Sequence, residues 1–195
     1  TRMVPAFDPG PSPHGPPPIL VGAVGHRMMA VAGEVADGLL VHPVNTRRSL
    51  SELTVPALAE GAARAGRELR DLEIVCVTIV VTGRDEAQMA RSREAVRSQL
   101  AFYGTTPAYL PVFELHGYGD LHPELQRLAR AGRWDDMGAL IDDELIETIA
   151  VVGEPGEIAG KVRDRLEGIS DSVSLVNNRA PDPEHLAEVV ADLHR

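Results

Sequence analysis

The hydrophobic positions of this chain fall into short continuous runs that alternate with longer stretches of helical spacing. Four apolar runs stand at residues 19–23, 39–41, 72–82 and 172–178. A short apolar run bounded by turn residues is typical of a buried strand in a parallel sheet. The third run, "LEIVCVTIVVT", is also rich in Val and Ile, which favour strands. The pattern therefore predicts about four parallel strands.

A helical stretch follows each predicted strand. Residues 26–36 place apolar side chains at one helical face, namely Met28, Met29, Ala32, Val35 and Ala36. Residues 49–66 predict a second helix capped by Ser49 or Ser51, with a kink or a short first segment because Pro56 lies inside it. This alternation is the βαβα rhythm of a parallel sheet with crossover helices.

Later helices extend the same rhythm. Asp85 is expected to cap a long helix that runs to about Tyr103, and Pro155 is placed to open another in its first turn. Asp182 and Pro183 open the last helix. Four strand–helix units are half of an eight-unit barrel, and four units alone leave parallel strand edges open.

The predicted domain organisation has three parts. Residues 1–18 contain seven prolines and are expected to form a linker or loop. Residues 19–195 are expected to form one domain. Within it, residues of about 104–150 predict a helical insertion, with loops at 117–122 and at Gly132, that interrupts the strand–helix rhythm.

Composition narrows the class of protein. A chain of 195 residues with 44% hydrophobic residues can bury a sizeable core. The formal charge of −10 would repel a phosphate backbone, which argues against nucleic acid as a partner. No apolar run has the length of a membrane span, and no signal peptide stands out. Cys76, the only cysteine, lies in an apolar run, so we expect a buried thiol and a cytoplasmic protein.

The turn after the first predicted strand is the main candidate for a binding site. If the strand ends at Ala23 and a helix begins at His26, then the amides near Gly25, His26 and Arg27 have no partner within the helix. The positive end of the helix dipole and Arg27 both favour an anion such as phosphate. The alternative is that Gly25 only makes a tight turn. His42 ends the second strand on the same face, where it could contact a ligand or simply cap and pack.

Two polar clusters were weighed as sites. The segment "HGYGDLH" and the next acidic residue bring together four metal-binding residue types, His116, Asp120, His122 and Glu124, but their spacing matches no metal motif, so no metal site is predicted. The segment "WDDMGALIDDE" could pair carboxylates for acid–base work. Its spacing instead favours an amphipathic helix with a solvent-exposed acidic face, formed by Asp135, Asp136, Asp142, Asp143 and Glu144. The predicted inward face is formed by Trp134, Met137, Leu140, Ile141 and Leu145.

Three segments carry a resemblance to a known family. "PPPILVGAVGHRMMAVAGEVADGLLVHP" resembles the segment P-P-I-…-A-G-x-x-x-x-x-L-A-G-E-x-A-D-G of the bacterial luciferase-like oxidoreductases, and "VVGEPGEIAGKVRDRL" resembles their late motif V-G-x-P-E-E-V-A-x-x-L. The piece "ELHGYGDLHPELQRLARAGRWDDMGALIDDELIETIAVVG" is similar to the branch that uses the deazaflavin coenzyme F420. The resemblance spans residues of about 7–168.

The resemblance implies a fold and a cofactor. The family fold is a (β/α)8 TIM barrel with an insertion, and this chain resembles only its C-terminal half, strands five to eight. In that family the turn after the fifth strand holds the phosphate of the cofactor with backbone amides. The corresponding positions here are Ala23, Val24, Gly25, His26 and Arg27, with His42 bordering the same face. The implied cofactor is coenzyme F420 or, alternatively, flavin mononucleotide (FMN).

Three functions follow from the resemblance. The first is an oxidoreductase that performs hydride transfer or monooxygenation on a small organic substrate, of which this chain is a truncated part; its partners are the cofactor and the substrate. The second is a non-catalytic flavin-binding half-barrel that dimerises across its open edges, like the nonfluorescent flavoproteins. The third is an inactive, incomplete gene product. The family's catalytic side chains belong to the other half of the barrel, so the resemblance assigns no catalytic residue, and the chain is expected to be a homo-oligomer or to lack its N-terminal half.

Overall fold

The structure is a computed structural model that describes residues 10, 13–176 and 183–194. Most of the predicted linker, the end of the last predicted strand and the predicted cap Asp182 lie outside these residues. Among the described residues, no helix is long and apolar enough to cross a membrane.

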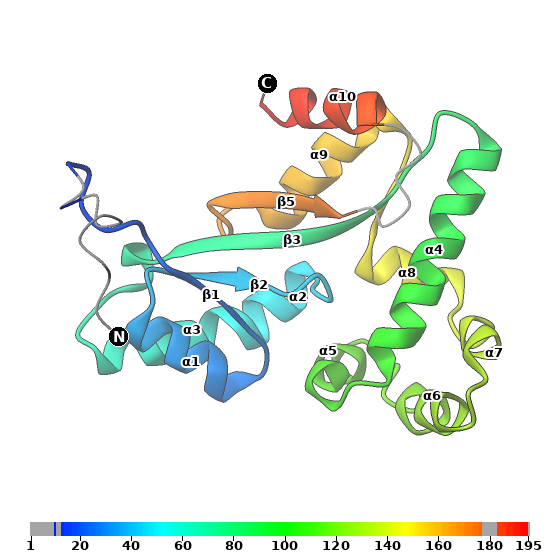
Figure 1. The fold of residues 1–195 in the computed structure, drawn as a ribbon, viewed down its shortest axis with the longest axis horizontal. Coiled ribbons are helices and arrows are strands. Elements are labelled where there is room, and N and C mark those ends of the chain that lie inside the picture. Colours follow the sequence, from blue (N-terminus) through cyan, green and yellow to red (C-terminus); the bar gives the residue numbers. More distant parts are fainter. Residues whose placement is uncertain (1–9, 11–12, 177–182, 195) are drawn as a thin grey trace.

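A parallel sheet forms the centre of the molecule (Figure 1). Its described strands are β1 (Leu20–Ala23), β2 (Gly38–Val41), β3 (Glu73–Val81), β4 (Val151–Val152) and β5 (Ser172–Val176). The order is β1-β2-β3-β4, and β5 pairs with the middle of β3. All of these pairings are parallel, which confirms the predicted fold class. The two-residue strand β4 was not predicted because "VV" is too short to stand out beside a helix.

Helices cover one face of this sheet. Helix α1 (His26–Val35) follows β1, α3 (Val55–Arg64) follows β2, α9 (Pro155–Leu166) follows β4, and α10 (Pro183–Leu193) follows β5. Side chains from both layers share one buried cluster: Leu39, Ile74 and Cys76 come from the strands, and Leu58 and Ile158 from the helices. The other face is only partly covered, since Leu40 of β2 is 41% exposed on it. A sheet covered by helices on one face matches part of a barrel rather than a doubly wound sheet.

The segment after β2 folds as three joined helical pieces. Helix α2 (Arg47–Ser49) is followed by a π-helix, η2 (Leu50–Thr54), and then by α3. Pro56 lies in the first turn of α3 and has no N–H to continue a regular helix, so the predicted interruption is confirmed. The predicted caps Ser49 and Ser51 are wrong. The cap is Thr46, whose hydroxyl accepts the Ser49 N–H, because the helix begins earlier than its apolar spacing indicated.

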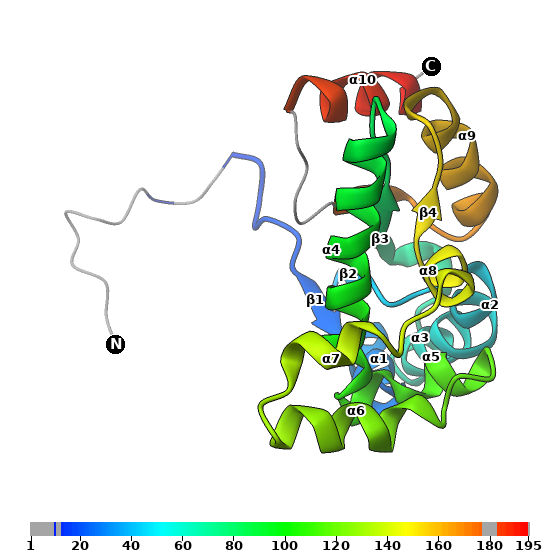
Figure 2. The same ribbon diagram turned by 90° about the vertical axis from the view of Figure 1, so that its right-hand side faces the viewer.

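The remaining helices form a second unit beyond the strand ends (Figure 2). They are α4 (Glu86–Gly104), α5 (Leu110–Leu115), α6 (Leu121–Arg130), α7 (Trp134–Gly138) and α8 (Asp143–Ile149), with a short 3-10 turn at η4 (Pro107–Tyr109). Another 3-10 turn, η3 (Leu69–Asp71), joins α3 to β3 in the sheet unit. Asp85 caps α4 as predicted. The buried side chains of α4 pack with those of α5 to α8 in a second buried cluster. This cluster is separate from the one that lies between the sheet and its helices. This packing supports an insertion that starts at α4, earlier than the predicted residue 104.

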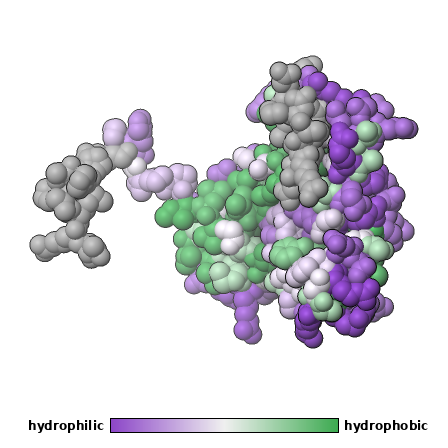
Figure 3. Space-filling view, turned by 45° about the vertical axis from the view of Figure 1, so that its right-hand side comes forward, coloured by the Kyte–Doolittle hydropathy of each residue, from purple (hydrophilic) through white to green (hydrophobic). Residues whose placement is uncertain are grey.

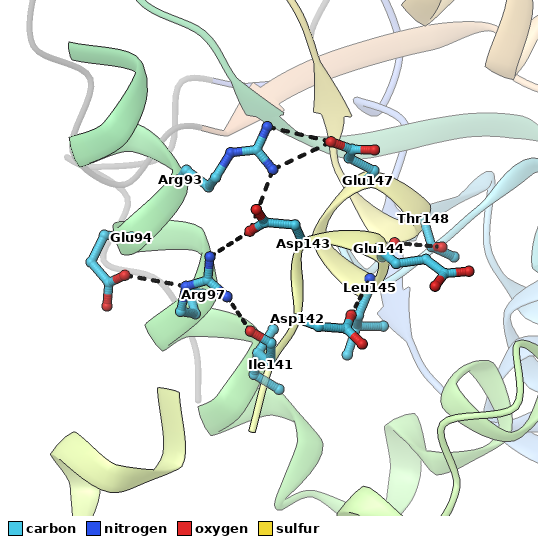
Figure 4. A network of polar contacts seen from close by, with 10 residues as sticks. All are labelled: Arg93, Glu94, Arg97, Ile141, Asp142, Asp143, Glu144, Leu145, Glu147 and Thr148. Atoms are coloured by element: carbon cyan, nitrogen blue, oxygen red, sulfur yellow. Dashed lines mark hydrogen bonds and ion pairs between the residues drawn. The ribbon is translucent and has the colours of Figure 1, made fainter. Parts of the chain in front are cut away.

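Ion pairs fasten α8 to α4 (Figure 4). Arg97 donates to Asp143 at 2.5 Å and also to the Ile141 carbonyl, while Arg93 lies 3.4 Å from Glu147. The hydrogen bond from Arg97 lowers the pKa of Asp143. The acidic side chains here therefore serve helix packing.

Arginines also cap the C-terminal ends of helices across the molecule. Arg165 of α9 donates to the carbonyls of Thr148, Ile149 and Ala150 at the end of α8. Arg47 does the same for the end of α9, and Arg48 donates to the Leu115 carbonyl at the end of α5. These contacts satisfy carbonyls that have no partner within their own helix, and those of Arg165 and Arg48 tie the insertion to the sheet unit.

Candidate functional site

The turn between β1 and α1 has the form that the sequence predicted. Strand β1 ends at Ala23 and α1 begins at His26, with Gly25 as its N-cap. The first bond of the helix is from the Met29 N–H to the Gly25 carbonyl, and within the described part of the chain no side chain caps the end. The amides of the first turn are therefore available to an acceptor from outside the helix.

Gly25 has a backbone conformation that excludes other residues. Its φ is +80° and its ψ is 146°, a region that is essentially reserved for glycine. A Cβ built at this position would meet no atom within 4 Å, so the space in front of the turn is open. The glycine is thus required by the turn, and the open space lets an anion approach the amides closely.

A cavity of about 290 Å³ lies in front of this turn. It is bounded by the β1–α1 turn, the C-terminal end of β2, the π-helix and the 107–112 segment of the insertion. The lining residues are Ala23, Val24, Gly25, His26, Met29, Val41, His42, Val44, Asn45, Ser49, Glu52, Leu53, Thr54, Pro56, Ala108, Pro111 and Val112. The structure thus brings together every predicted site residue except Arg27, which does not line the cavity.

Larger hollows occur elsewhere in the described chain. One of about 600 Å³ lies between β5, α9 and α10, and one of about 780 Å³ lies beside the N-terminal ends of α4 and α9. We assign the site to the smaller cavity because it lies at the C-terminal ends of parallel strands and faces an uncapped helix start. Ligands bind at that end of the strands in barrels and open α/β sheets.

His26 contributes to the cavity mainly through its backbone. Its Nε2 lies 2.8 Å from Oε2 of Glu60 on α3, and the side chain is 64% exposed. The imidazole therefore turns toward α3. The positive character of the cavity mouth comes from the helix end and its amides.

His42 is held rigidly at the rim of the cavity. Its ring stacks on Tyr109, with centroids 4.1 Å apart, and meets Tyr103 edge-on at 4.9 Å. The Val44 N–H donates to Nδ1 of His42 at 3.2 Å, so in the neutral ring the proton is on Nε2. Burial lowers the pKa of His42 to about 4. The ring contacts confirm that His42 packs, it also lines the cavity, and its contact with a ligand stays a prediction. In this state His42 offers a neutral N–H donor.

Asn45 fixes the floor of the cavity. Its Nδ2 donates to the carbonyls of His42 at 2.7 Å and Val77 at 2.8 Å, which joins the end of β2 to β3. These two bonds determine the orientation of the amide. The buried Oδ1 has no hydrogen-bond partner among the residues that the structure describes.

The residues weighed as metal ligands point to separate partners. Nε2 of His116 lies 2.9 Å from the Thr46 hydroxyl, and Nδ1 of His122 lies 2.7 Å from the Gly104 carbonyl. Glu124 pairs with Arg127. Over the described part of the chain, no group of three or more metal-binding side chains is found.

The carboxylates of 134–145 lie on the wet face of the helices, as predicted. Asp142 caps α8 by accepting the Leu145 N–H, and Asp136 pairs with Arg133. Met137, Ile141 and Leu145 are buried. Trp134 was wrongly predicted to face inward: it is 55% exposed, because it is the first residue of the short helix α7 and borders a surface hollow beside α4.

A comparison with protein families decides what kind of protein this is. The model of the family described as "Luciferase-like monooxygenase" matches residues 2–172. The chain belongs to the luciferase-like monooxygenase family.

Relatives within the luciferase-like family include deazaflavin enzymes. An uncharacterized protein of Mycobacterium tuberculosis is 50% identical over 171 residues, covering 88% of this chain and 50% of the relative. The 5,10-methylenetetrahydromethanopterin reductase of Methanopyrus kandleri is 30% identical over 176 residues, covering 89% and 48%. A putative coenzyme F420-dependent oxidoreductase of Mycobacterium tuberculosis is 32% identical over 143 residues, covering 70% and 40%. The chain thus spans about half the length of the curated luciferase-like relatives that it matches.

Solved structures agree on the fold of this luciferase-like chain. The coenzyme F420-dependent tetrahydromethanopterin reductase of Methanopyrus kandleri matches with a TM-score of 0.69 at 28% identity, covering 89% of this chain and 48% of that one. An F420-dependent secondary alcohol dehydrogenase in complex with an F420–acetone adduct matches with a TM-score of 0.61. At 15% identity, the second match supports the fold alone.

Several residues in and around the cavity were not predicted. Asn45 follows the second strand, where a polar residue next to a strand end was the only signal, and Thr54 ends the π-helix. Pro111 and Val112 line the cavity from the insertion, and Tyr109 stacks on His42. The place of these three residues depends on how the insertion folds back. No local pattern in the sequence contains that information.

Proposed function

We propose that this luciferase-like chain is part of an oxidoreductase that uses coenzyme F420 for hydride transfer to or from a small organic substrate. Two of its named relatives support the proposal: a methylenetetrahydromethanopterin reductase and a putative F420-dependent oxidoreductase. We favour hydride transfer over monooxygenation, and F420 over FMN, because those named relatives are a reductase and an F420-dependent enzyme. We also propose a cytoplasmic location, and the support is that the buried thiol of Cys76 forms no disulfide.

One observation carries the assignment of the binding site: the uncapped, glycine-initiated start of α1 opens onto a cavity at the strand ends. We assign the phosphate group of the cofactor to this turn. The amides of Gly25, His26 and Arg27 would donate to its oxygens, and the helix dipole favours the negative charge. The open space at the Gly25 Cβ position fits a group that approaches the backbone this closely.

The cofactor itself supplies the hydride chemistry when bound. The residues of this chain bind and orient it. His42 presents its Nε2–H at the rim, held in place by Tyr109 and Tyr103. Leu53, Pro111 and Val112 give the cavity apolar walls that exclude water.

The cavity is too small for a whole deazaflavin cofactor. Its volume of about 290 Å³ is at the lower end of the range for sites that hold drug-sized ligands. We therefore propose that this chain holds the phosphate and its neighbouring atoms. The catalytic residue stays unassigned.

Binding titrations of paired glycine variants test the proposal. In Gly25→Val, the side chain enters the space in front of the amides and the turn is strained, so the Kd for coenzyme F420 should rise about tenfold or more, the loss expected for a charged hydrogen bond. Gly66→Val is the matched control. Gly66 also has a positive φ, +69°, and open space around it, but it lies at the far end of α3. It should leave the Kd unchanged.

The outcomes separate the candidate functions. An unchanged Kd in Gly25→Val, or equal losses in both variants, would argue against the phosphate site. FMN is titrated in parallel, and tighter binding of FMN would overturn the choice of cofactor. Binding without any turnover of reduced cofactor would favour the non-catalytic flavin-binding half-barrel, for which the half-length match to the relatives is the support.

A further inference from the structure

The wall of the candidate cavity carries a negative charge. Of the described residues that line the cavity, Glu52 is the one carboxylate, and no lysine or arginine is among them. Burial lowers the pKa of His42 to about 4, so its ring is neutral at pH 7, and the imidazole of His26 turns toward Glu60 on α3. Because a carboxylate repels a phosphate, Glu52 by itself opposes the proposed use of the cavity.

Arg48 places a positive charge directly against this carboxylate. It belongs to α2, four positions before Glu52 in the π-helix, and its Nε lies 2.8 Å from Oε1 of Glu52. The two side chains are 54% and 50% exposed. An ion pair this exposed contributes little to the free energy of unfolding. The contact therefore matters more for the charge of the cavity wall than for folding.

A second hydrogen bond fixes the position of the Arg48 guanidinium. Its Nη1 donates to the Leu115 carbonyl at 2.8 Å, at the end of α5. The same planar group thus has one partner on the π-helix and another on the insertion. Because the two bonds leave from different nitrogens of a rigid fork, they hold the guanidinium beside Glu52.

The apolar surroundings make this charge balance important. Most of the lining residues are apolar, among them Met29, Leu53 and Val112. Figure 3 shows the same contrast on the surface, where a hydrophobic area near the N-terminal segment is bordered by hydrophilic residues. Charges interact more strongly beside apolar walls than in open water. Without a partner, the charge of Glu52 would therefore weaken the binding of an anion in the cavity.

We propose that Arg48 is a positioning residue for anion binding: it neutralises Glu52, so that the amides at the start of α1 dominate the field in the cavity. Arg48 does not line the cavity and acts through Glu52. This inference rests on the proposed function, because it takes the anion to be the phosphate of the cofactor. It adds a charge requirement that the glycine turn alone does not contain.

Titrations with coenzyme F420 test this role in folded variants, checked by circular dichroism. In Arg48→Met the Kd should rise about threefold to tenfold, the effect of one partly exposed charge. Adding Glu52→Gln to Arg48→Met removes the repulsion, so the Kd should return to within about twofold of the wild type. Arg47→Met is the matched control: it removes a positive charge from the same helix, but Arg47 donates to carbonyls at the end of α9. It should leave the Kd unchanged.

The other outcomes separate this inference from the proposed function. If the double variant binds as weakly as Arg48→Met, then Arg48 acts through the Leu115 carbonyl and the charge role is wrong. A wild-type Kd in Arg48→Met also overturns it. If Gly25→Val keeps the wild-type Kd while Arg48→Met shows the expected loss and rescue, only the phosphate site at the turn is rejected. A wild type that binds no coenzyme F420 overturns both proposals.

Discussion

His42 shows how packing around one residue sets its chemistry. The ring is stacked on Tyr109 and accepts the Val44 N–H, so it is placed as a neutral donor at the cavity rim. Desolvation lowers its pKa from 6.5 to about 4. A neutral ring is a donor whose strength does not change across physiological pH.

This state of His42 predicts a pH dependence of stability. Between pH 6.5 and 4 the unfolded chain takes up a proton at this residue and the folded chain does not, so the free energy of unfolding falls as the pH falls through that range. The ring is partly exposed, so we expect a loss of about 1 kcal/mol. NMR should find His42 neutral, with the proton on Nε2, at pH 5.5.

The variant His42→Gln should show less loss of stability over this pH range in urea unfolding. His194→Gln, at an exposed position just after α10, should keep the wild-type dependence. A titration midpoint of His42 near 6.5 would contradict the assigned burial.

At this scale the sequence predicted the backbone of the β1–α1 turn well and the side chains around the cavity poorly. The run from Ala23 to His26 was placed correctly because a strand, a glycine and a helix start follow one another directly in the chain. Arg27 was included for its charge, but the cavity does not contact it. Asn45 and Tyr109 were missed because their contacts with the His42 region depend on tertiary structure.

At the scale of helices, α1 and α3 approach unusually closely. A Cβ built on Gly61 would lie 1.7 Å from the Ala30 carbonyl oxygen, and one built on Gly33 would lie 2.1 Å from the Leu58 carbonyl oxygen. The backbones of the two helices therefore touch at these glycines. This contact positions the start of α1, and with it the turn to which we assign the phosphate.

Gly61→Ala should accordingly destabilise the chain by about 2–4 kcal/mol, since two helix backbones must move apart. Gly160→Ala, in α9, is the matched control: no atom lies within 4 Å of its Cβ position, so alanine should stabilise by about 0.5–1 kcal/mol. Urea unfolding measures both. Equal effects of the two substitutions would show that the close helix contact is not present in solution.

Helix positions were largely predictable, but the surroundings of each helix were not. Pro56 predicted the interruption of the helix after β2, because the effect of its missing N–H is local. The π-helix that precedes α3 could not be predicted from the sequence. Trp134 was predicted to face inward because it is hydrophobic. It stands in the first turn of α7, which is too short to show a clear apolar face. Apolar periodicity assigns a face to a helix only when the helix is long enough to show one.

At the scale of the whole molecule, two buried clusters share a single strand. Ile74, Cys76 and Val80 of β3 belong to the cluster under the sheet, and Ile79 and Val81 belong to the cluster of the insertion. Arg165 adds a second connection by capping α8 from α9. We therefore expect the two units to unfold together.

Leu145→Ala tests this coupling. Leu145 is fully buried in the insertion, so its truncation should cost about 2–5 kcal/mol. Trp134, the only tryptophan, reports the insertion by fluorescence, and circular dichroism reports all the helices. The two urea transitions should coincide in the wild type and shift together in the variant. Leu58→Ala, in the other cluster, should shift both transitions in the same way. If the fluorescence transition of Leu145→Ala instead occurs at lower urea than its circular dichroism transition, the two units unfold independently.

The overall architecture was predictable because strand and helix patterns alternate in the sequence, from residues 19–23 to the final helix. The start of the insertion was not. Asp85 to Tyr103 has the pattern of any crossover helix, and only its packing against α5 to α8 distinguishes α4 from the helices under the sheet.

The pairing of β3 with β5 has a consequence for how the chain folds. Val75 pairs with Ser172, which lies 97 positions later in the chain, and closing such a loop costs entropy that no local contact offsets. Contacts this distant in sequence slow folding. The helices α4 to α8 lie inside that loop and bury a cluster of their own, so their early formation would shorten the path between the two strands. The insertion that walls the cavity would then also be the element that brings β5 beside β3.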